Sequence, residues 1–439
     1  MAMGIKIVTD RVFLIPSIIS SMRGNDPTKP DAGGTGERAW KTIYLLLCLA
    51  LLAFTVYQFS RHLLFPTTGW DYQTYMSAVQ TLNHQQNPYV FKNLVQYQSF
   101  APHLAFDYPP HTLYFFWLLD FFLIFHNITI YYALLAILLL ISGYLIVTLD
   151  RKPRYLFLAM LLLTAFGSTF WNFLTGNTGI LSLFLFSVIF TLLSKEKYWQ
   201  SSIVMGLSAA VSLFTAPFIA LYLVVKRPIR DRLVLVAIST GIVASLFVAG
   251  YLINPSFVHS YFSLMLGGGS PFLDSGGWNT PTPYLLFRAA LSGIALGSTI
   301  PLILVSCVYG CLILYATGRY CMNNRDNPLK ILSLVMLAVF MVLPRLKPYN
   351  FIILVVPLYF LFKDCSYRIK SLLLAVIALL PFLIWSARYL DIKNDMLPFL
   401  PGSYVQAYSL IIVFLLVILH DHGTHAAGEA GDGPKHPVE

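Results

Sequence analysis

Apolar runs long enough to cross a lipid bilayer fill most of the chain from Trp40 onward. A hydrocarbon layer about 30 Å thick requires about 20 apolar residues in an α-helix. Only 11% of the 439 residues are charged and 57% are hydrophobic, whereas soluble domains carry about 25% charged residues. The sequence therefore predicts an all-α polytopic membrane protein, with no segment of useful size left for a separate soluble domain.

The net charge of +10 comes mostly from lysines and arginines in short loops between the apolar runs. Such loops belong on the cytoplasmic side under the positive-inside rule, which gives about twelve crossings with both termini inside. No basic helix or aromatic-rich soluble face is present to bind nucleic acid. We therefore expect the lipid bilayer, and not a nucleic acid, to be the partner of this charge.

Three regions follow from this pattern. Residues 1–39 are polar, lack the features of a signal peptide and are expected to form a disordered cytoplasmic N-terminus. Residues 40–420 form the transmembrane domain. Residues 421–439 are rich in Gly, His and Pro and are expected to form a disordered cytoplasmic tail.

The five cysteines show neither disulfide nor zinc spacing, so we expect no disulfide and no bound metal. Three are expected inside apolar helices and two in cytoplasmic loops: Cys48, Cys307 and Cys311, then Cys321 and Cys365.

The apolar run Leu113–Phe125 is about 13 residues long, too short for a full crossing. It follows two prolines and is interrupted by Asp120. We expect it to lie along the outer surface, which makes Ile128–Leu149 the second crossing. This assignment also places three basic residues in the cytoplasm, namely Arg151, Lys152 and Arg154.

Two further segments depart from regular spans. Ile203–Leu213 and Phe218–Val225 are expected to be two short helices that meet at Thr215–Pro217, as is tolerated beside protein or a water-filled cavity. The segment Asn254–Ser298 is expected to be a second large outer loop, and it contains the polar candidate Asn279.

Polar residues gather in the first outer loop, where Asp71 follows the first span, Thr42–Phe59. With Tyr72 and Tyr75 on the next turns, Asp71 is expected in a partly dehydrated pocket. Dehydration raises the pKa of a carboxyl group and suits a general base. Asp is also a favoured residue for capping a helix N-terminus, here that of the run Tyr72–Leu82, and the spacing leaves both interpretations open.

Asp107 is the second carboxylate candidate, because it precedes Tyr108 and the two prolines that begin the next helix. Its charge also suits the positive end of that helix, which is the simpler explanation of its position. Asn177 follows a short turn, where its amide group suits either a sugar hydroxyl or the turn backbone.

Arg345 and Lys347 form a cationic pair on the outer side, against the general charge bias. Charge-assisted donors of this kind suit a lipid-linked phosphate, although such side chains also reach lipid headgroups. Arg288 and His259 are further candidates for the same site. The complete set of expected substrate-binding residues is Tyr72, Tyr75, Asp107, Tyr108, Asn177, His259, Asn279, Arg288, Arg345 and Lys347.

Several short motifs, in this order, resemble those of GT-C-type glycosyltransferases, and of glycosyltransferase family 87 in particular. That family comprises the polyprenyl-phosphate-dependent mannosyl- and arabinofuranosyltransferases of bacteria. The motifs occur at Gly69–Tyr75, Asn87–Tyr89, Tyr108–Pro110, Thr175–Asn177 and Ser212–Pro217. The resemblance implies a GT-C-type fold with juxtamembrane helices in the first outer loop. It also implies that Asp71 is the catalytic base.

Two stretches depart from the family pattern. Thr215–Pro217 lacks the usual lysine before proline, and Arg345–Pro348 is more basic than the corresponding stretch of the family. The assignment of Arg345 and Lys347 to the donor phosphate therefore comes from their charge alone.

The resemblance implies transfer of a sugar from a polyprenyl-phosphate-linked donor to a glycolipid or glycan acceptor, on the extracytoplasmic side of the cell membrane, without a metal or other cofactor. Two other classes compete with this function. A lipid-linked sugar flippase or transporter usually places ionisable residues inside its spans and shows matched repeats, and neither is evident here. An enzyme resembling O-antigen polymerases has its large outer loop late in the chain, whereas the richest loop here is the first.

Overall fold

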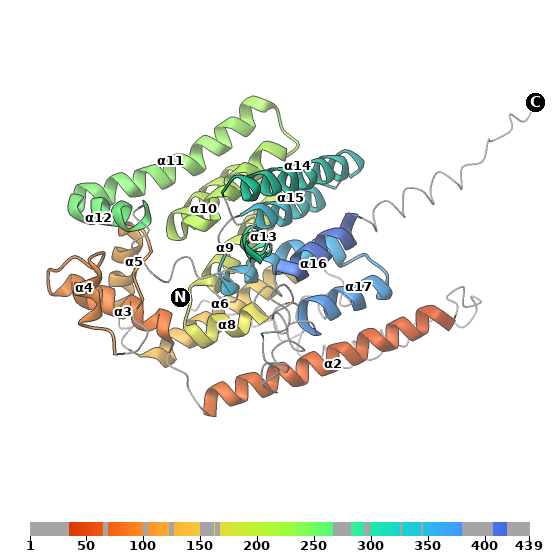
Figure 1. The fold of residues 1–439 in the computed structure, drawn as a ribbon, viewed down its shortest axis with the longest axis horizontal. Coiled ribbons are helices and arrows are strands. Elements are labelled where there is room, and N and C mark those ends of the chain that lie inside the picture. The colour runs from red at the N-terminus through yellow and green to blue at the C-terminus, as the bar shows by residue number, and fades with distance from the viewer. Residues whose placement is uncertain are drawn as a thin grey trace, which may run out of the picture.

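A computed structural model describes residues 35–64, 69–99, 104–122, 127–149, 162, 167–266, 282–293, 299–324, 327–343, 346–379 and 407–418. Helices make up 85% of the structure, and the described ranges contain no strand. The prediction of an all-α protein is thus confirmed. Figure 1 shows the helices as a bundle, with α2 (Thr35–Leu64) running along one edge.

Three helices in the described ranges are long and apolar enough to cross a bilayer, namely α6 (Ile128–Thr148), α11 (Ile229–Ile253) and α14 (Thr299–Asn323). The expected second crossing, Ile128–Leu149, corresponds closely to α6. The 30-residue α2 contains the expected first span and begins at Thr35, inside the region expected to be disordered. The total of about twelve crossings and their orientation stay predictions.

Three short helices form the loop that is expected on the outer side after the first span: α3 (Trp70–Asn83), α4 (Phe91–Val95) and α5 (Pro110–Phe121). They lie together at one end of the bundle, beside α12 (Pro255–Leu266), as Figure 1 shows. At 12 residues α5 spans about 18 Å, which is too short to cross a bilayer. Its length therefore agrees with a surface helix, and its placement on the outer face stays a prediction.

The centre of the chain forms a compact series of helices. These are α8 (Gly167–Thr175), α9 (Gly179–Ser194), α10 (Tyr198–Val211) and the 3₁₀ helix η1 (Leu213–Val224). The expected break at Thr215–Pro217 is wrong in position, because the chain instead turns at Ser212, whose backbone is extended (φ −143°, ψ 101°). Pro217 lies inside η1, which continues past it for seven residues to Val224.

The segment expected as a second outer loop, Asn254–Ser298, is partly helical, since it contains α12 and α13 (Pro283–Gly293). The C-terminal part consists of α15 (Pro328–Val342), η2 (Pro348–Leu354), α16 (Val355–Phe362), α17 (Tyr367–Leu374), the π-helical η3 (Ala375–Leu379) and a helix at Ala407–Ile418. All five cysteines are free thiols. Cys321 lies within α14, so its expected position in a loop is wrong.

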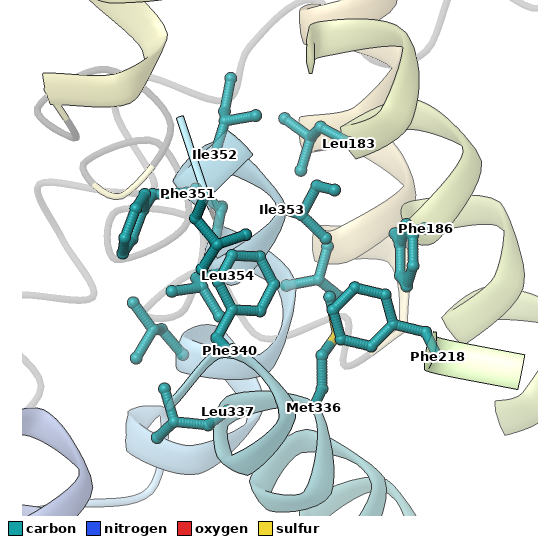
Figure 2. Packing of buried hydrophobic residues seen from close by; sticks show 14 of the residues in the cluster. Leu183, Phe186, Phe218, Met336, Leu337, Phe340, Phe351, Ile352, Ile353 and Leu354 are labelled. Atoms are coloured by element: carbon teal, nitrogen blue, oxygen red, sulfur yellow. The ribbon is translucent and has the colours of Figure 1, made fainter. Parts of the chain in front are cut away.

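The core sits where α9, η1, α15 and η2 meet, and Figure 2 shows its apolar side chains interlocking. Phe218 of η1 stacks on Phe340 of α15 at 5.4 Å and meets Phe186 of α9 edge to face at 5.3 Å. All three rings are fully buried. Removing a ring of this kind costs about 3–5 kcal/mol in a packed core, so these three rings fix η1 against α9 and α15.

Candidate active site

Asp71 is the second residue of α3, and Gly69 directly precedes this helix. Gly69 occupies the N-cap position in a left-handed conformation (φ 44°), and no side chain caps the helix. A β-carbon at this position would lie 2.8 Å from the hydroxyl of Tyr132, so only glycine fits. The interpretation of Asp71 as a helix cap is therefore wrong, which leaves its carboxylate available for another role.

The partner of the Asp71 carboxylate comes from the turn between α8 and α9. Asn177 Nδ2 donates a hydrogen bond of 2.9 Å to Asp71 Oδ2, while Asn177 Oδ1 accepts one of 2.9 Å from the backbone N–H of Gly179. Because a backbone N–H can only donate, this second bond fixes which end of the amide faces Asp71. Asn177 thus bonds the turn backbone, as one of the two interpretations expected, and it also holds the Asp71 carboxylate. Its contact with a sugar stays a prediction.

The α8–α9 turn approaches α3 very closely. Gly176 has φ 70°, and a β-carbon there would lie 2.6 Å from the β-carbon of Tyr72. Tyr72 in turn packs against Tyr131 of α6 at 5.3 Å, and the Tyr131 hydroxyl donates to the carbonyl of Gly176. The turn is therefore held by α3 on one side and α6 on the other.

Dehydration raises the pKa of Asp71 from its usual value to about 6. The amide of Asn177 and the hydroxyl of Thr175 partly oppose this rise, as does the more distant charge of Lys347, whereas Asp107 adds to it. Asp71 keeps partial solvent exposure although protein atoms surround its carboxyl group. A carboxylate with a pKa near 6 is ionised at neutral pH and is a stronger base than an ordinary aspartate.

A chain of hydroxyl groups continues from Asn177. The Tyr75 hydroxyl accepts from Asn177 Nδ2 at 3.2 Å and lies 2.9 Å from the Tyr108 hydroxyl. The Tyr108 hydroxyl then lies 3.0 Å from Thr178 Oγ1. Both tyrosine rings pack around Phe116 of α5, with Tyr75 stacked on it at 4.6 Å. The first outer loop and the start of α9 are thereby joined through polar contacts within an aromatic cluster.

A pocket with about 670 Å³ of empty space, including its open mouth, lies beside this chain. Its polar wall contains Asp107, Tyr108, Asn177, Thr178 and Lys347, and its apolar wall is formed by side chains of η1 and α12. Asp71 lies directly behind Asn177 and does not itself line the pocket. Among the described residues, no cluster of three or more His, Cys, Asp or Glu side chains has the arrangement of a metal site.

The structure therefore brings together six of the expected site residues around Asp71 or its pocket, namely Tyr72, Tyr75, Asp107, Tyr108, Asn177 and Lys347. Lys347 begins η2, which contacts α8 and α9. His259 and Arg288 are exposed on α12 and α13 and do not line the pocket. Asn279 and Arg345 lie outside the described residues.

Sequence reasoning missed Thr178 and Tyr261, which also line the pocket. Thr178 directly follows the Thr175–Asn177 motif, so its position next to a candidate was a usable signal. Tyr261 lies two residues after His259 on the same helix, and its side chain is buried in contact with Tyr89. The sequence contains no signal that favours Tyr261 over His259, because only the packing of α12 decides which of them faces the pocket.

Comparison with known proteins identifies the family of this chain. The model of glycosyltransferase family 87 matches residues 106–344, more than half of the chain. No curated protein and no solved structure matches the chain. The matched range contains Asp107, Asn177 and Thr178, while Asp71 precedes it and Lys347 follows it. The match decides against a flippase or transporter, and the chain belongs to glycosyltransferase family 87, as a membrane glycosyltransferase.

Proposed function

We propose that this glycosyltransferase takes its sugar from a polyprenyl-phosphate-linked donor and transfers it to a hydroxyl group of a glycolipid or glycan acceptor. Asp71 is the general base, and the reaction takes place on the extracytoplasmic face of the cell membrane. The observation that carries this proposal is the dehydrated carboxylate of Asp71, which is held by Asn177, a residue that lines the same pocket as Lys347.

In this reaction Asp71 accepts the proton of the acceptor hydroxyl as its oxygen attacks the anomeric carbon of the donor sugar. The bond between that carbon and the phosphate oxygen breaks, and the phosphate leaves with the bonding electrons. A phosphate leaving group needs no proton at neutral pH, so one carboxylate suffices where glycosidases use two. The proton stays on Asp71, whose pKa of about 6 suits both taking it up and releasing it afterwards.

Lys347 supports the donor part of the proposal. It lines the pocket and immediately precedes η2. A cation there stabilises the negative charge that grows on the departing phosphate. Arg345 precedes it by two residues and is proposed for the same role on the ground of its charge alone.

The extracytoplasmic side is supported by the distribution of basic loops along the sequence. The carboxylates, tyrosines and asparagine of the site all belong to segments that this topology places outside. The apolar wall of the pocket, which includes Leu213 and Phe214 of η1, suits the lipid end of a donor.

Purified protein reconstituted in liposomes provides the test. We expect polyprenyl phosphate to be released from polyprenyl-phosphate-linked mannose or arabinofuranose when a glycolipid acceptor is added, and no transfer from nucleotide-linked sugars. Transfer from a nucleotide sugar alone would refute the proposed donor.

Asp107→Asn serves as the matched comparison for Asp71→Asn, since Asp107 lines the pocket beside Asp71. If only Asp107→Asn abolishes transfer, Asp107 is the base.

A further inference from the structure

The hydroxyl chain from Asn177 to Thr178 has only one direction in which the hydrogens of both tyrosine hydroxyls find acceptors. Asn177 contributes hydrogens at its start, because its oxygen is occupied by the backbone N–H of Gly179. Tyr75 receives one of them at 3.2 Å. The only other hydrogen-bond partner of the Tyr75 hydroxyl among the described residues is the Tyr108 hydroxyl, at 2.9 Å.

If Tyr108 donated to Tyr75, the hydrogen of Tyr75 would have no acceptor, in a side chain that is 2% exposed. An unmatched buried donor loses its hydration without compensation and is disfavoured. Tyr75 must therefore donate to Tyr108, and by the same reasoning Tyr108 donates to Thr178 Oγ1 at 3.0 Å. Burial raises the pKa of both tyrosines, so both hydroxyls keep their hydrogens at neutral pH.

The chain ends at the hydrogen of the Thr178 hydroxyl. Thr178 occupies the N-cap position of α9, but its side chain makes no capping bond. Among the described residues its hydroxyl has no hydrogen-bond partner besides Tyr108, and the side chain is 6% exposed on the wall of the pocket. Within this chain of groups, the Thr178 hydrogen is the one that no described residue accepts, and it lies at the pocket, where a bound molecule can accept it.

We propose that the Thr178 hydroxyl donates a hydrogen bond to a phosphate oxygen of the lipid-linked donor, and that Tyr75 and Tyr108 are positioning residues that fix its direction. Lys347 lines the same pocket, and the N-terminal end of α9, where Thr178 occupies the N-cap position, attracts negative charge. Both features favour an anionic oxygen over a neutral one. The assignment rests on the proposed lipid-phosphate donor and adds a contact to it.

The chain orients the donor but carries no proton between Asp71 and Thr178. The side-chain amide of Asn177 lies between them, and an amide does not exchange its hydrogens as an acid near neutral pH. Loss of the Thr178 hydroxyl should therefore change donor affinity and leave the acidic limb of the pH–rate profile, set by Asp71, unchanged.

Binding of farnesyl phosphate, compared with farnesol, tests the contact in the purified full-length protein. We expect the wild type to prefer farnesyl phosphate, and Thr178→Val to weaken its binding by about tenfold to a hundredfold, as expected for a lost bond to a charged group. Farnesol binding should not change. Thr178→Ser should bind farnesyl phosphate nearly as well as the wild type. Thr191→Val, which removes a buried hydroxyl further along α9, is the matched control and should bind normally.

Tyr108→Phe provides a second, independent measurement if Thr178→Val does not fold. It removes the hydroxyl group that directs the Thr178 hydroxyl. We expect it to weaken farnesyl phosphate binding by a smaller factor than Thr178→Val does. Unchanged binding in Thr178→Val, or equal loss in Thr178→Ser, would overturn the contact while leaving the lipid-phosphate donor in place. Loss confined to a sugar-bearing donor would overturn the assignment to phosphate. A wild type without preference for farnesyl phosphate over farnesol would instead refute the proposed donor itself.

Discussion

Replacing Asp71 by asparagine should separate catalysis from stability. The substitution keeps the size of the side chain, and the new amide oxygen can still accept from Asn177. Its amide nitrogen can donate to the Thr175 hydroxyl oxygen, and this hydroxyl already interacts with the Asp71 carboxyl group in the wild type. Because asparagine cannot act as a base, we expect the rate of transfer to fall by about 10²–10⁴-fold.

The same variant should lose activity but gain stability at neutral pH. The pKa of Asp71 rises from 3.8 to about 6 on folding, so ionisation of this group destabilises the fold. A rise of about 2 units corresponds to at most about 3 kcal/mol. This cost is absent below pH 4, develops as the pH rises towards 6 and is complete above it. Asp71→Asn should therefore be more stable than the wild type at pH 7.5 and nearly equal to it at pH 4.

Thermal unfolding in detergent at the two pH values, with transfer measured in liposomes, is the assay. If the variant were less stable than the wild type at pH 7.5, the claim that dehydration raises the pKa of Asp71 would be refuted. Its role as base would be refuted if a folded, donor-binding variant transferred sugar at a near-normal rate. The two outcomes are independent, since one concerns the environment of the carboxylate and the other its use.

Four further results are expected. The kcat/KM of the wild type should fall about tenfold per pH unit below pH 6, because only ionised Asp71 accepts a proton, and a profile flat down to pH 5 would contradict this. Lys347→Ala should weaken polyprenyl phosphate binding by about tenfold to over a hundredfold, measured by titration, with acceptor affinity unchanged. Gly176→Ala should destabilise the protein by about 1–3 kcal/mol in thermal unfolding, because its β-carbon would lie 2.6 Å from a side-chain carbon of α3; Gly241→Ala, with open space around it, is the control. A cysteine at position 152, in a background without the native cysteines, should be labelled only from the cytoplasmic side, and labelling from outside would exclude the proposed topology.

The helices were the predictable part of the fold, because apolar runs and prolines determine where a helix forms or ends through residues that are close in the sequence. The run expected as the second crossing became α6, and the short run after the two prolines became α5. The break near Pro217 was misplaced, since proline is tolerated inside the 3₁₀ geometry of η1 and the extended backbone occurs at Ser212. Sequence rules for proline assume an α-helix and do not apply to η1.

The site was predictable only as a set of candidates. The sequence pointed to Asp71 and Asn177 separately, but their hydrogen bond joins residues 106 positions apart and depends on how α3 packs against the α8–α9 turn. The sequence also left open whether Asp71 caps its helix, and the left-handed Gly69 decides this through a close contact with α6. Such approaches arise from packing, so local patterns cannot reveal them.

The pairing of Asp71 with Asn177 also has a consequence for biosynthesis. Asp71 leaves the ribosome 106 residues before its hydrogen-bond partner, which at typical elongation rates is roughly 5–20 s earlier. A carboxylate without a partner is costly to dehydrate, so the nascent first outer loop must keep Asp71 in water throughout this interval. The hydrogen bond between Asp71 and Asn177 can form only after the α8–α9 turn has been synthesised and has reached α3. The loop that carries Asp71 is therefore translated early but completes its folding late.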